Sequence, residues 1–500
     1  MSTLLTERSR RATAGGLAGL VCMLAGGCGS QLDPYQVAAA REGGAAQVAG
    51  AAAAPPAGGE VAAQPGDAPG AGAGTPPAAD APQDATGLGA PADPGAPDAP
   101  AASGGGDVPA DVPEANAPVG DGPQGTCEGF ANGPGITDST ITIANASDIT
   151  GPVPGLFLAA RQGTEAFAAY YNATEKLCGR SLKVLELDSS ADAGADQQAY
   201  TRACNEAFAA VGSVSSADAG GAATAAGCGL PDVRAFTVTP QRQGCGTCFA
   251  SYSVDSSQIA ASQPQYWLKK EPQASQHVGI FYVDVAAAKT NAESFGRGFE
   301  KAGMNVDVVQ GIQTSEFNYV PYVETMKRED LDFIMYFGPY QFAIRLQKAM
   351  QQQGFRPTVY LQDPTIYDAG YVAQAGGAGE GSYVYSTNEL FDSQAAEMKL
   401  YRAYLDQVAP GATPNYYGLY AWSATRLFVE QATALGGRLD RASLVAALRK
   451  VKGWTGNGLH APMSVGTGDT SPCIRIIRLT GSTWKQVSPG DYVCGGLIGT

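Results

Sequence analysis

Hydroxyl-bearing, aromatic and acidic residues directly follow several predicted strands of this chain. In the first half they occupy positions 147–152, 213–218 and 239–241, and in the second half positions 284, 337–340 and 362–365. In open α/β sheets, ligands bind beyond the carboxyl ends of the strands, where helix N-termini also offer free N–H groups. Hydroxyls and amides in one half and aromatic and acidic groups in the other suit a zwitterion or another small polar molecule. Any one of these residues could equally be a helix cap or a core side chain.

Catalytic motifs are absent from the sequence. It contains no G-x-S-x-G, no H-E-x-x-H, no P-loop and no dinucleotide fingerprint. The chain has two histidines, His277 and His460, so a Ser-His-Asp site is conceivable but unsupported. A pair of catalytic carboxylates stays open. The sequence therefore favours binding over catalysis and predicts that the protein is not an enzyme.

Ten cysteines indicate an exported, disulfide-bonded protein. Cys22 and Cys28 lie near the N-terminus, and eight lie further on, at positions 127, 178, 204, 228, 245, 248, 473 and 494. Eight cysteines allow 105 pairings. We favour Cys473–Cys494, which would close a C-terminal hairpin across the turn at Gly481, and next Cys178–Cys204.

Cys245-Gly-Thr-Cys248 is a C-x-x-C motif. A redox role requires a strand–helix context with the first cysteine at a helix N-terminus. Here the motif lies in a Gln/Gly-rich stretch, which favours structural disulfides. Two thiols with no histidine nearby in sequence do not complete a zinc site, so we predict neither a metal nor a cofactor.

The N-terminus reads as a targeting segment. Arg8, Arg10 and Arg11 precede an apolar stretch of 11 residues, 14–24, which is too short to span a bilayer as a helix. The sequence Leu24-Ala-Gly-Gly-Cys28 resembles the lipobox of bacterial lipoproteins, with Ala25 in the position usually held by leucine. This resemblance implies a signal peptide over 1–27, lipidation of Cys28 and anchoring at the cell membrane. An ordinary secretory signal is the alternative.

Residues 28–126 are predicted to be a disordered linker. Between positions 51 and 120, 50 of 70 residues are Ala, Gly or Pro, nine are acidic and none is Lys, Arg or aromatic. Such a segment cannot bury enough apolar surface to offset its chain entropy. Its flexible reach is roughly 50–60 Å, enough to hold a folded part clear of a membrane.

The remaining 374 residues, 127–500, exceed what one core usually supports, which predicts two lobes. They contain 28 Lys+Arg and 34 Asp+Glu, a net charge of −6, and no basic cluster, so no nucleic-acid partner is expected.

Strand-like and helix-like runs alternate along this part, which indicates βαβ units and parallel sheets. The predicted strands are 140–145, 182–188, 209–212, 235–239, 278–283, 306–310, 332–337, 358–361 and 382–385. The predicted helices are 155–171, 341–353, 415–435 and 441–451, the last with Asp440 as its N-cap. We therefore expect an α/β fold of two doubly wound, Rossmann-like lobes. Lobe one would cover about 135–272 plus a return segment, lobe two about 273–415, and the hairpin about 470–500.

Several motifs together resemble the type I periplasmic binding proteins, in the branch that includes leucine/isoleucine/valine-binding proteins of ABC transporters. They are the stretches 141–152, 171–173, 178–184, 212–218, 281–284, 336–340 and 419–424. The likeness covers about 135–487. It implies the two-lobed fold of that family and a solute bound between the lobes.

The resemblance also implies roles for particular residues. In that family, Ser/Thr loops of the first lobe hold the ligand carboxylate, and an acidic residue of the second lobe holds the ammonium. Carried over, the carboxylate side would be Ser215, Ser216 and Thr239. Thr150, in the loop after the first strand, is a further candidate ligand-binding residue. The aromatic and acidic side would be Tyr282, Tyr340 and Asp363.

The chain departs from the family pattern in two places. The stretch 285–289 lacks the aromatic residue usual there, and Arg242 stands among residues that are usually small and polar. Arg242 is either a contact for an acidic ligand or a solvated surface residue.

Taken together, the sequence predicts a monomeric, lipid-anchored solute-binding protein of an ABC importer. It would capture an amino acid or related compound between its lobes and deliver it to a membrane permease. A ligand-sensing receptor on the same fold is the alternative, and an exported hydrolase is less favoured.

Overall fold

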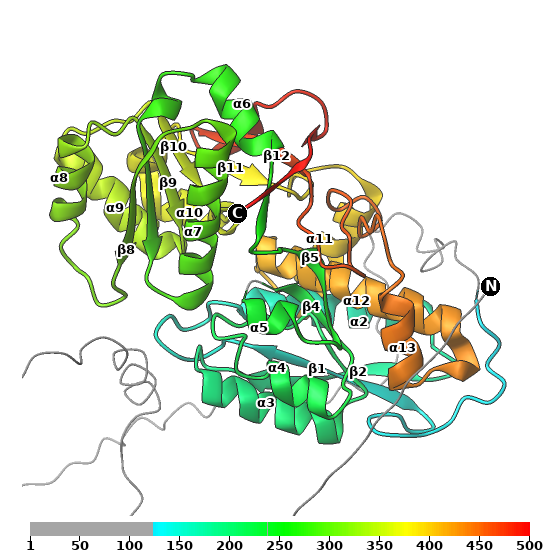
Figure 1. Cartoon of the computed structure of the whole chain (residues 1–500). Coiled ribbons are helices and arrows are strands. Elements are labelled where there is room, and N and C mark those ends of the chain that lie inside the picture. The colour runs from blue at the N-terminus through cyan, green and yellow to red at the C-terminus, as the bar shows by residue number, and fades with distance from the viewer. Residues whose placement is uncertain (1–123, 238) are drawn as a thin grey trace, which may run out of the picture. The chain divides into compact units, whose positions relative to one another are not determined.

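The computed structural model describes residues 124–237 and 239–500. Within these ranges the chain forms two α/β lobes (Figure 1). The predicted signal peptide, Cys28 and nearly all of the predicted linker lie outside the described residues. None of the helices within the described ranges combines the length and the hydrophobicity needed to cross a membrane.

Lobe one contains a parallel five-stranded sheet in the order β2-β1-β3-β4-β5. Its strands are β1 (Thr140–Ser147), β2 (Ser181–Asp188), β3 (Ala209–Val211), β4 (Asp232–Thr237) and β5 (Cys248–Ser253). The helices that follow them in sequence are α2 (Leu158–Thr174), α3 (Ala193–Glu206), α4 (Ala222–Gly227) and α5 (Pro240–Gln243). β3 and most of β1 are buried because helices cover both faces of the sheet.

Three later helices complete lobe one: α11 (Ala396–Val408), α12 (Tyr416–Leu435) and α13 (Arg441–Leu448). Both α11 and α12 pack against α2. Gly163 of α2 and Gly418 of α12 permit a close approach of the two backbones. A Cβ atom on Gly163 would lie 2.1 Å from the carbonyl oxygen of Gly418. Asp440 caps α13 through a capping box with Ser443, as its position in the sequence predicts.

Lobe two contains the second sheet, in which β7 to β11 are parallel and β12 and β13 run antiparallel at one edge. Its strands are β7 (Val278–Val283), β8 (Val306–Ile312), β9 (Phe333–Phe337), β10 (Val359–Gln362), β11 (Tyr383–Ser386), β12 (Cys473–Thr480) and β13 (Thr483–Gln486), with β14 (Val493–Cys494) paired to β12. Its helices are α6 (Ser262–Lys270), α7 (Ala286–Ala302), α8 (Val320–Arg328), α9 (Tyr340–Gln352) and α10 (Ala369–Ala375). The predicted C-terminal hairpin is thus an edge of the second sheet.

The chain passes between the lobes three times. It leaves lobe one after β5 through β6 (Gln258–Ala260), returns between β11 and α11, and leaves again between α13 and β12. The return comes earlier than the predicted boundary at 415, because Met398, Tyr401 and Tyr404 bury one face of α11 in lobe one. β15 (Leu497–Gly499) pairs with β6 and brings the C-terminus to the first crossing.

Four disulfides join the eight cysteines of the described part: Cys127–Cys178, Cys204–Cys228, Cys245–Cys248 and Cys473–Cys494. Cys473–Cys494 is the pair that the hairpin predicts. The predicted Cys178–Cys204 pair is wrong. Cys178 lies in the turn before β2, beside the incoming segment that carries Cys127. Cys204 lies near the end of α3, against the C-cap of α4 where Cys228 sits.

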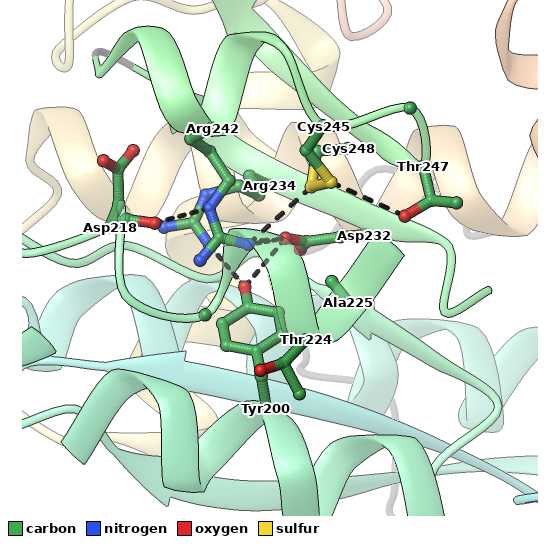
Figure 2. Close-up of a disulfide and its surroundings, with 12 residues drawn as sticks. Tyr200, Asp218, Thr224, Ala225, Asp232, Arg234, Arg242, Cys245, Thr247 and Cys248 are labelled. Atoms are coloured by element: carbon green, nitrogen blue, oxygen red, sulfur yellow. Dashed lines mark hydrogen bonds and ion pairs between the residues drawn. A yellow bond between two sulfur atoms is a disulfide. The ribbon is translucent and has the colours of Figure 1, made fainter. Parts of the chain in front are cut away.

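Arg242, next to the C-x-x-C disulfide, is an interior residue (Figure 2). Its guanidinium forms ion pairs with Asp196 at 3.0 Å and Asp232 at 2.9 Å, and lies 4.4 Å from the ring centre of Tyr200. Neither interpretation of Arg242 from the sequence was right, since it contacts neither solvent nor the cavity described below. The disulfide itself links the residues after α5 to the first residue of β5, so neither cysteine begins a helix.

Candidate functional site

A cavity of about 130 Å³ lies between the two lobes. A single buried water needs roughly 10–15 Å³ measured in this way, so the cavity can hold a small organic molecule. Its lining residues lie at the carboxyl ends of strands in both sheets. Ser215 and Ser216 follow β3, and Val283, Phe337, Asp363 and Tyr385 end or follow β7, β9, β10 and β11. This is where ligands bind in open α/β sheets.

Aromatic side chains dominate the cavity walls. Phe157, Phe236, Tyr416 and Tyr417 interlock on the side of lobe one, with Phe157 and Tyr417 ring centres 4.6 Å apart. On the side of lobe two, the ring of Phe295 lies 5.2 Å from that of Phe337 and 5.4 Å from that of Tyr385. Such walls suit an apolar body.

The polar lining residues are few and mostly neutral. They are Ser215, Ser216, Gln258, Asn291, Ser294, Asp363, Thr365 and Thr470. Among the described residues that line the cavity, Asp363 is the one charged residue, and Lys, Arg and His do not occur.

Asp363 is held by backbone groups. It follows β10, and its two carboxylate oxygens accept hydrogen bonds from the N–H groups of Gly338 and Thr365, each at 2.8 Å. Its exposed fraction is 6%, and burial raises its pKa to about 6. Burial also raises the pKa of Tyr417, as do the nearby carboxylates, so this phenol stays neutral. At neutral pH the cavity therefore presents a carboxylate amid neutral, largely aromatic groups.

Ser216 lines the cavity, but its donors are engaged. Its backbone N–H and its hydroxyl both donate to Oδ2 of Asp148, at 2.8 and 2.7 Å. Asp148 follows β1 and is fully buried. Ser215 Oγ accepts the N–H of Ala217 at 3.1 Å. The sequence pointed to the loop containing Asp148 but gave it no role.

The structure does not bring four of the predicted ligand residues to the cavity. The Thr150 hydroxyl donates to Asp188 at 2.6 Å, and the Thr239 hydroxyl donates to Asp218. The ring of Tyr282 lies over Gly311. Tyr340 lines a neighbouring hollow, which shares Leu156, Pro339, Thr365 and Tyr417 with the cavity. Ser215, Ser216 and Asp363 are the predicted residues that do line the cavity.

Sequence reasoning missed most of the aromatic walls. Tyr416 and Tyr417 directly follow the N-cap Asn415 of α12, where two adjacent tyrosines at a helix N-terminus gave a usable signal. Phe295 lies in the third turn of α7, beyond the stretch 285–289 where an aromatic residue was expected.

One histidine does lie beside a serine. His460 Nε2 and Ser423 Oγ are 2.7 Å apart, and His460 Nδ1 lies 2.9 Å from the carbonyl oxygen of Ala461. Both side chains are buried and neither lines the cavity. Burial lowers the pKa of His460 to about 4. With a backbone carbonyl in place of a carboxylate partner, this pair is not a Ser-His-Asp triad.

The chain belongs to the periplasmic binding protein family, whose model matches residues 140–483. The family is made up of solute-binding proteins, so membership implies a protein that works outside the cytoplasm. The type I fold predicted from the sequence is confirmed by solved structures of branched-chain amino acid binding proteins. Among curated protein sequences, none matches this chain.

Three solved structures illustrate the likeness. A fatty acid ABC transporter substrate-binding protein from Thermomonospora curvata has a TM-score of 0.64 at 18% identity, covering 72% of this chain and 94% of its own. A branched-chain amino acid transporter substrate-binding protein from Streptococcus pneumoniae, solved with isoleucine, has a TM-score of 0.60 at 17% identity. The match covers 70% of this chain and 100% of that protein. A solute-binding protein from R. palustris, solved with 4-hydroxybenzoate, has a TM-score of 0.59 at 16% identity. The match covers 71% of this chain and 96% of that protein. At these identities the likeness concerns the fold.

Proposed function

We propose that this protein is an extracytoplasmic solute-binding lipoprotein of an ABC importer. It captures a small organic solute in the cavity between its lobes, and the closed form delivers the solute to a membrane permease. The observation that supports this is the cavity itself, which lies at the carboxyl ends of both sheets in a member of the periplasmic binding protein family. Three chain crossings between the lobes provide the hinge that closure requires.

The lining of the cavity weakens the expectation from the sequence that the solute is an amino acid. Of the three residues expected to hold a carboxylate, Thr239 lies outside the cavity and Ser216 already donates to Asp148. The apolar walls favour a solute with a substantial hydrocarbon or aromatic part.

Anchoring through Cys28 and the linker over 28–126 belongs to the same proposal. Metabolic labelling with a radioactive fatty acid tests it in a bacterial host. The full chain should incorporate label, and a Cys28→Ser variant should not. Label retained by Cys28→Ser would contradict the anchor.

A blocked cavity tests the binding role. Asn291 of α7 lines the cavity, whereas Glu293 on the same helix does not and its side chain is 44% exposed. In a thermal-shift screen of small amines, acids, alcohols and amino acids, the parent chain and Glu293→Trp should be stabilised by the same compounds. Asn291→Trp should lose that stabilisation, because an indole fills the cavity. Stabilisation that persists in Asn291→Trp would place binding elsewhere. Loss of uptake of the identified solute in a deletion strain would favour transport over sensing.

A further inference from the structure

We propose that the solute is an organic cation: an ammonium group attached to an aromatic or aliphatic body. This inference rests on the proposed solute-binding function and names the chemical class that the cavity accepts. It departs from the amino acids, fatty acid and hydroxybenzoate named for the similar structures.

The first step is the sign of the charge around the cavity. Asp363 lines it, and Asp148 lies directly behind Ser216, which also lines it. The carboxylates of Asp363, Asp368 and Asp148 all act on the hydroxyl of Tyr417, which lies in the wall. Among the described lining residues no basic side chain offsets these charges. The cavity is therefore electronegative.

The second step is the state of the Asp363 carboxylate. Its protein partners, the N–H groups of Gly338 and Thr365 and the side chain of Thr365, are all neutral. A carboxylate offers about four acceptor positions, so one or more stay open to a ligand. A buried carboxylate without a cation is unfavourable, and the raised pKa of Asp363 reports this penalty. A bound ammonium would remove the penalty, whereas a bound anion would increase it.

The third step concerns the walls. The faces of Tyr and Phe rings attract a cation within roughly 6 Å of the ring centre. Tyr385, Tyr416 and Tyr417 line the cavity together with Asp363, and all three phenols are neutral because burial raises their pKa. Aromatic rings together with one carboxylate provide the groups that bind an ammonium, and the remaining apolar lining accommodates its hydrocarbon part.

The fourth step concerns a solute that carries a carboxylate. Of the donors that the resemblance assigns to a solute carboxylate, the N–H and hydroxyl of Ser216 are both occupied by Asp148. A solute carboxylate at this loop would lie next to a buried carboxylate of the protein. Amino acids and simple acids should therefore bind more weakly than the corresponding amines.

Four probes that share one body test the charge preference on the full chain. They are 2-phenylethylamine, 2-phenylethanol, L-phenylalanine and 3-phenylpropionate, with hexylamine, hexanol, norleucine and hexanoate as a second series of different shape. Titration calorimetry at pH 7.5 should find the amine at least tenfold tighter than the alcohol in one series or both. The alcohol should in turn bind more tightly than the acid.

Two variants test whether Asp363 causes the preference for the amine over the alcohol. Asp363→Asn keeps the size of the side chain and should abolish the tenfold advantage of the amine without weakening the alcohol. Asp284→Asn is the control, since Asp284 follows β7, is exposed and does not line the cavity. If Asp363→Asn does not fold, the parent chain supplies a second readout. Amine affinity should fall below about pH 6 as Asp363 takes up a proton, while alcohol affinity stays constant. The other charged groups near the Tyr417 hydroxyl are Asp148 and Asp368, and the tyrosines of the cavity wall stay neutral over this pH range.

The outcomes separate the two proposals. Equal binding of amine and alcohol, or tightest binding of the zwitterion or acid, overturns the cation inference and leaves the binding function standing. If no member of either series binds, both the inference and the role of this cavity are overturned. An amine preference that Asp363→Asn retains, with no loss at low pH, also overturns the assignment.

Discussion

Ser216 directs both its backbone N–H and its hydroxyl at one oxygen of Asp148, at 2.8 and 2.7 Å. The two residues meet because β1 and β3 are parallel neighbours in the sheet, so the loops after them are adjacent. The other oxygen, Oδ1, has no hydrogen-bond partner within the described residues although it is buried. A carboxylate of the chain itself thus occupies donors that could otherwise hold the carboxylate of a zwitterionic solute.

Removing that carboxylate should change the charge preference of the cavity. In Asp148→Ala, the donors of Ser216 become available and a negative charge is lost. The affinity for 3-phenylpropionate should rise at least tenfold, as measured by titration calorimetry. Asp284→Ala, which removes a carboxylate beyond β7 that does not line the cavity, should leave the affinity unchanged. Acid binding that stays unchanged in Asp148→Ala would show that Asp148 does not control selectivity.

The buried Arg242 should be essential for stability. Arg242→Met leaves Asp196 buried without its ion-pair partner, although Asp232 keeps Arg234 at 3.4 Å, and an unpaired buried charge typically costs about 3–5 kcal/mol. Arg202→Met is the matched control, because Arg202 forms an exposed ion pair with Glu206, and exposed pairs are screened by solvent and contribute little to stability. Urea denaturation measures both. Similar losses in the two variants would mean that the buried network contributes no more than a surface pair.

The disulfides should differ in their contribution to stability. In the chain-entropy description, a bridge over 51 positions, Cys127–Cys178, restrains the unfolded chain by about 4 kcal/mol. One over 3 positions, Cys245–Cys248, restrains it by about 2 kcal/mol. Replacing each pair by serines and comparing the free energies of unfolding checks this order. A larger loss for the short bridge would show that it supports the folded state through contacts such as that with Arg242.

Acid should weaken the fold through His460. Burial lowers its pKa from about 6.5 to about 4, so between these values the unfolded chain binds a proton that the folded chain does not. Stability from this group is complete above pH 6.5 and declines as the pH falls towards 4, by up to about 3 kcal/mol. His460→Gln removes the titration. The difference in unfolding free energy between the parent and this variant should therefore shrink from pH 7 to pH 4. A difference independent of pH would contradict the assignment.

Much of the architecture could be predicted from local patterns. Val278–Val283 is a continuous apolar run and forms β7 with those bounds, and Asp440 caps α13 as its spacing indicates. The alternation of strands and helices also predicted which loops lie at the carboxyl edges of the sheets. Ser215, Ser216 and Asp363 lie in these loops and line the cavity. These features depend on short stretches of sequence and on the general geometry of parallel sheets.

Pairings between distant residues could not be predicted. The side chain of Arg242 is neutralised by Asp196 and Asp232, and nothing near Arg242 in sequence reveals that it is buried. Thr239 stands in the expected loop, yet its hydroxyl turns to Asp218 and away from the cavity. The Cys178–Cys204 prediction failed for the same reason, since the path of the segment that carries Cys127 follows from tertiary packing.

The pairing of β15 with β6 makes the C-terminus suitable for reporting on the hinge. The N–H of Thr500 donates to the carbonyl of Ser257 at 2.6 Å, and its hydroxyl donates to that of Ser256 at 3.1 Å. The last residues are thus fastened to the first crossing between the lobes. A fluorophore attached after Thr500 would follow the bending of this crossing, so the protein could be converted into an optical sensor for its own solute without labelling the cavity.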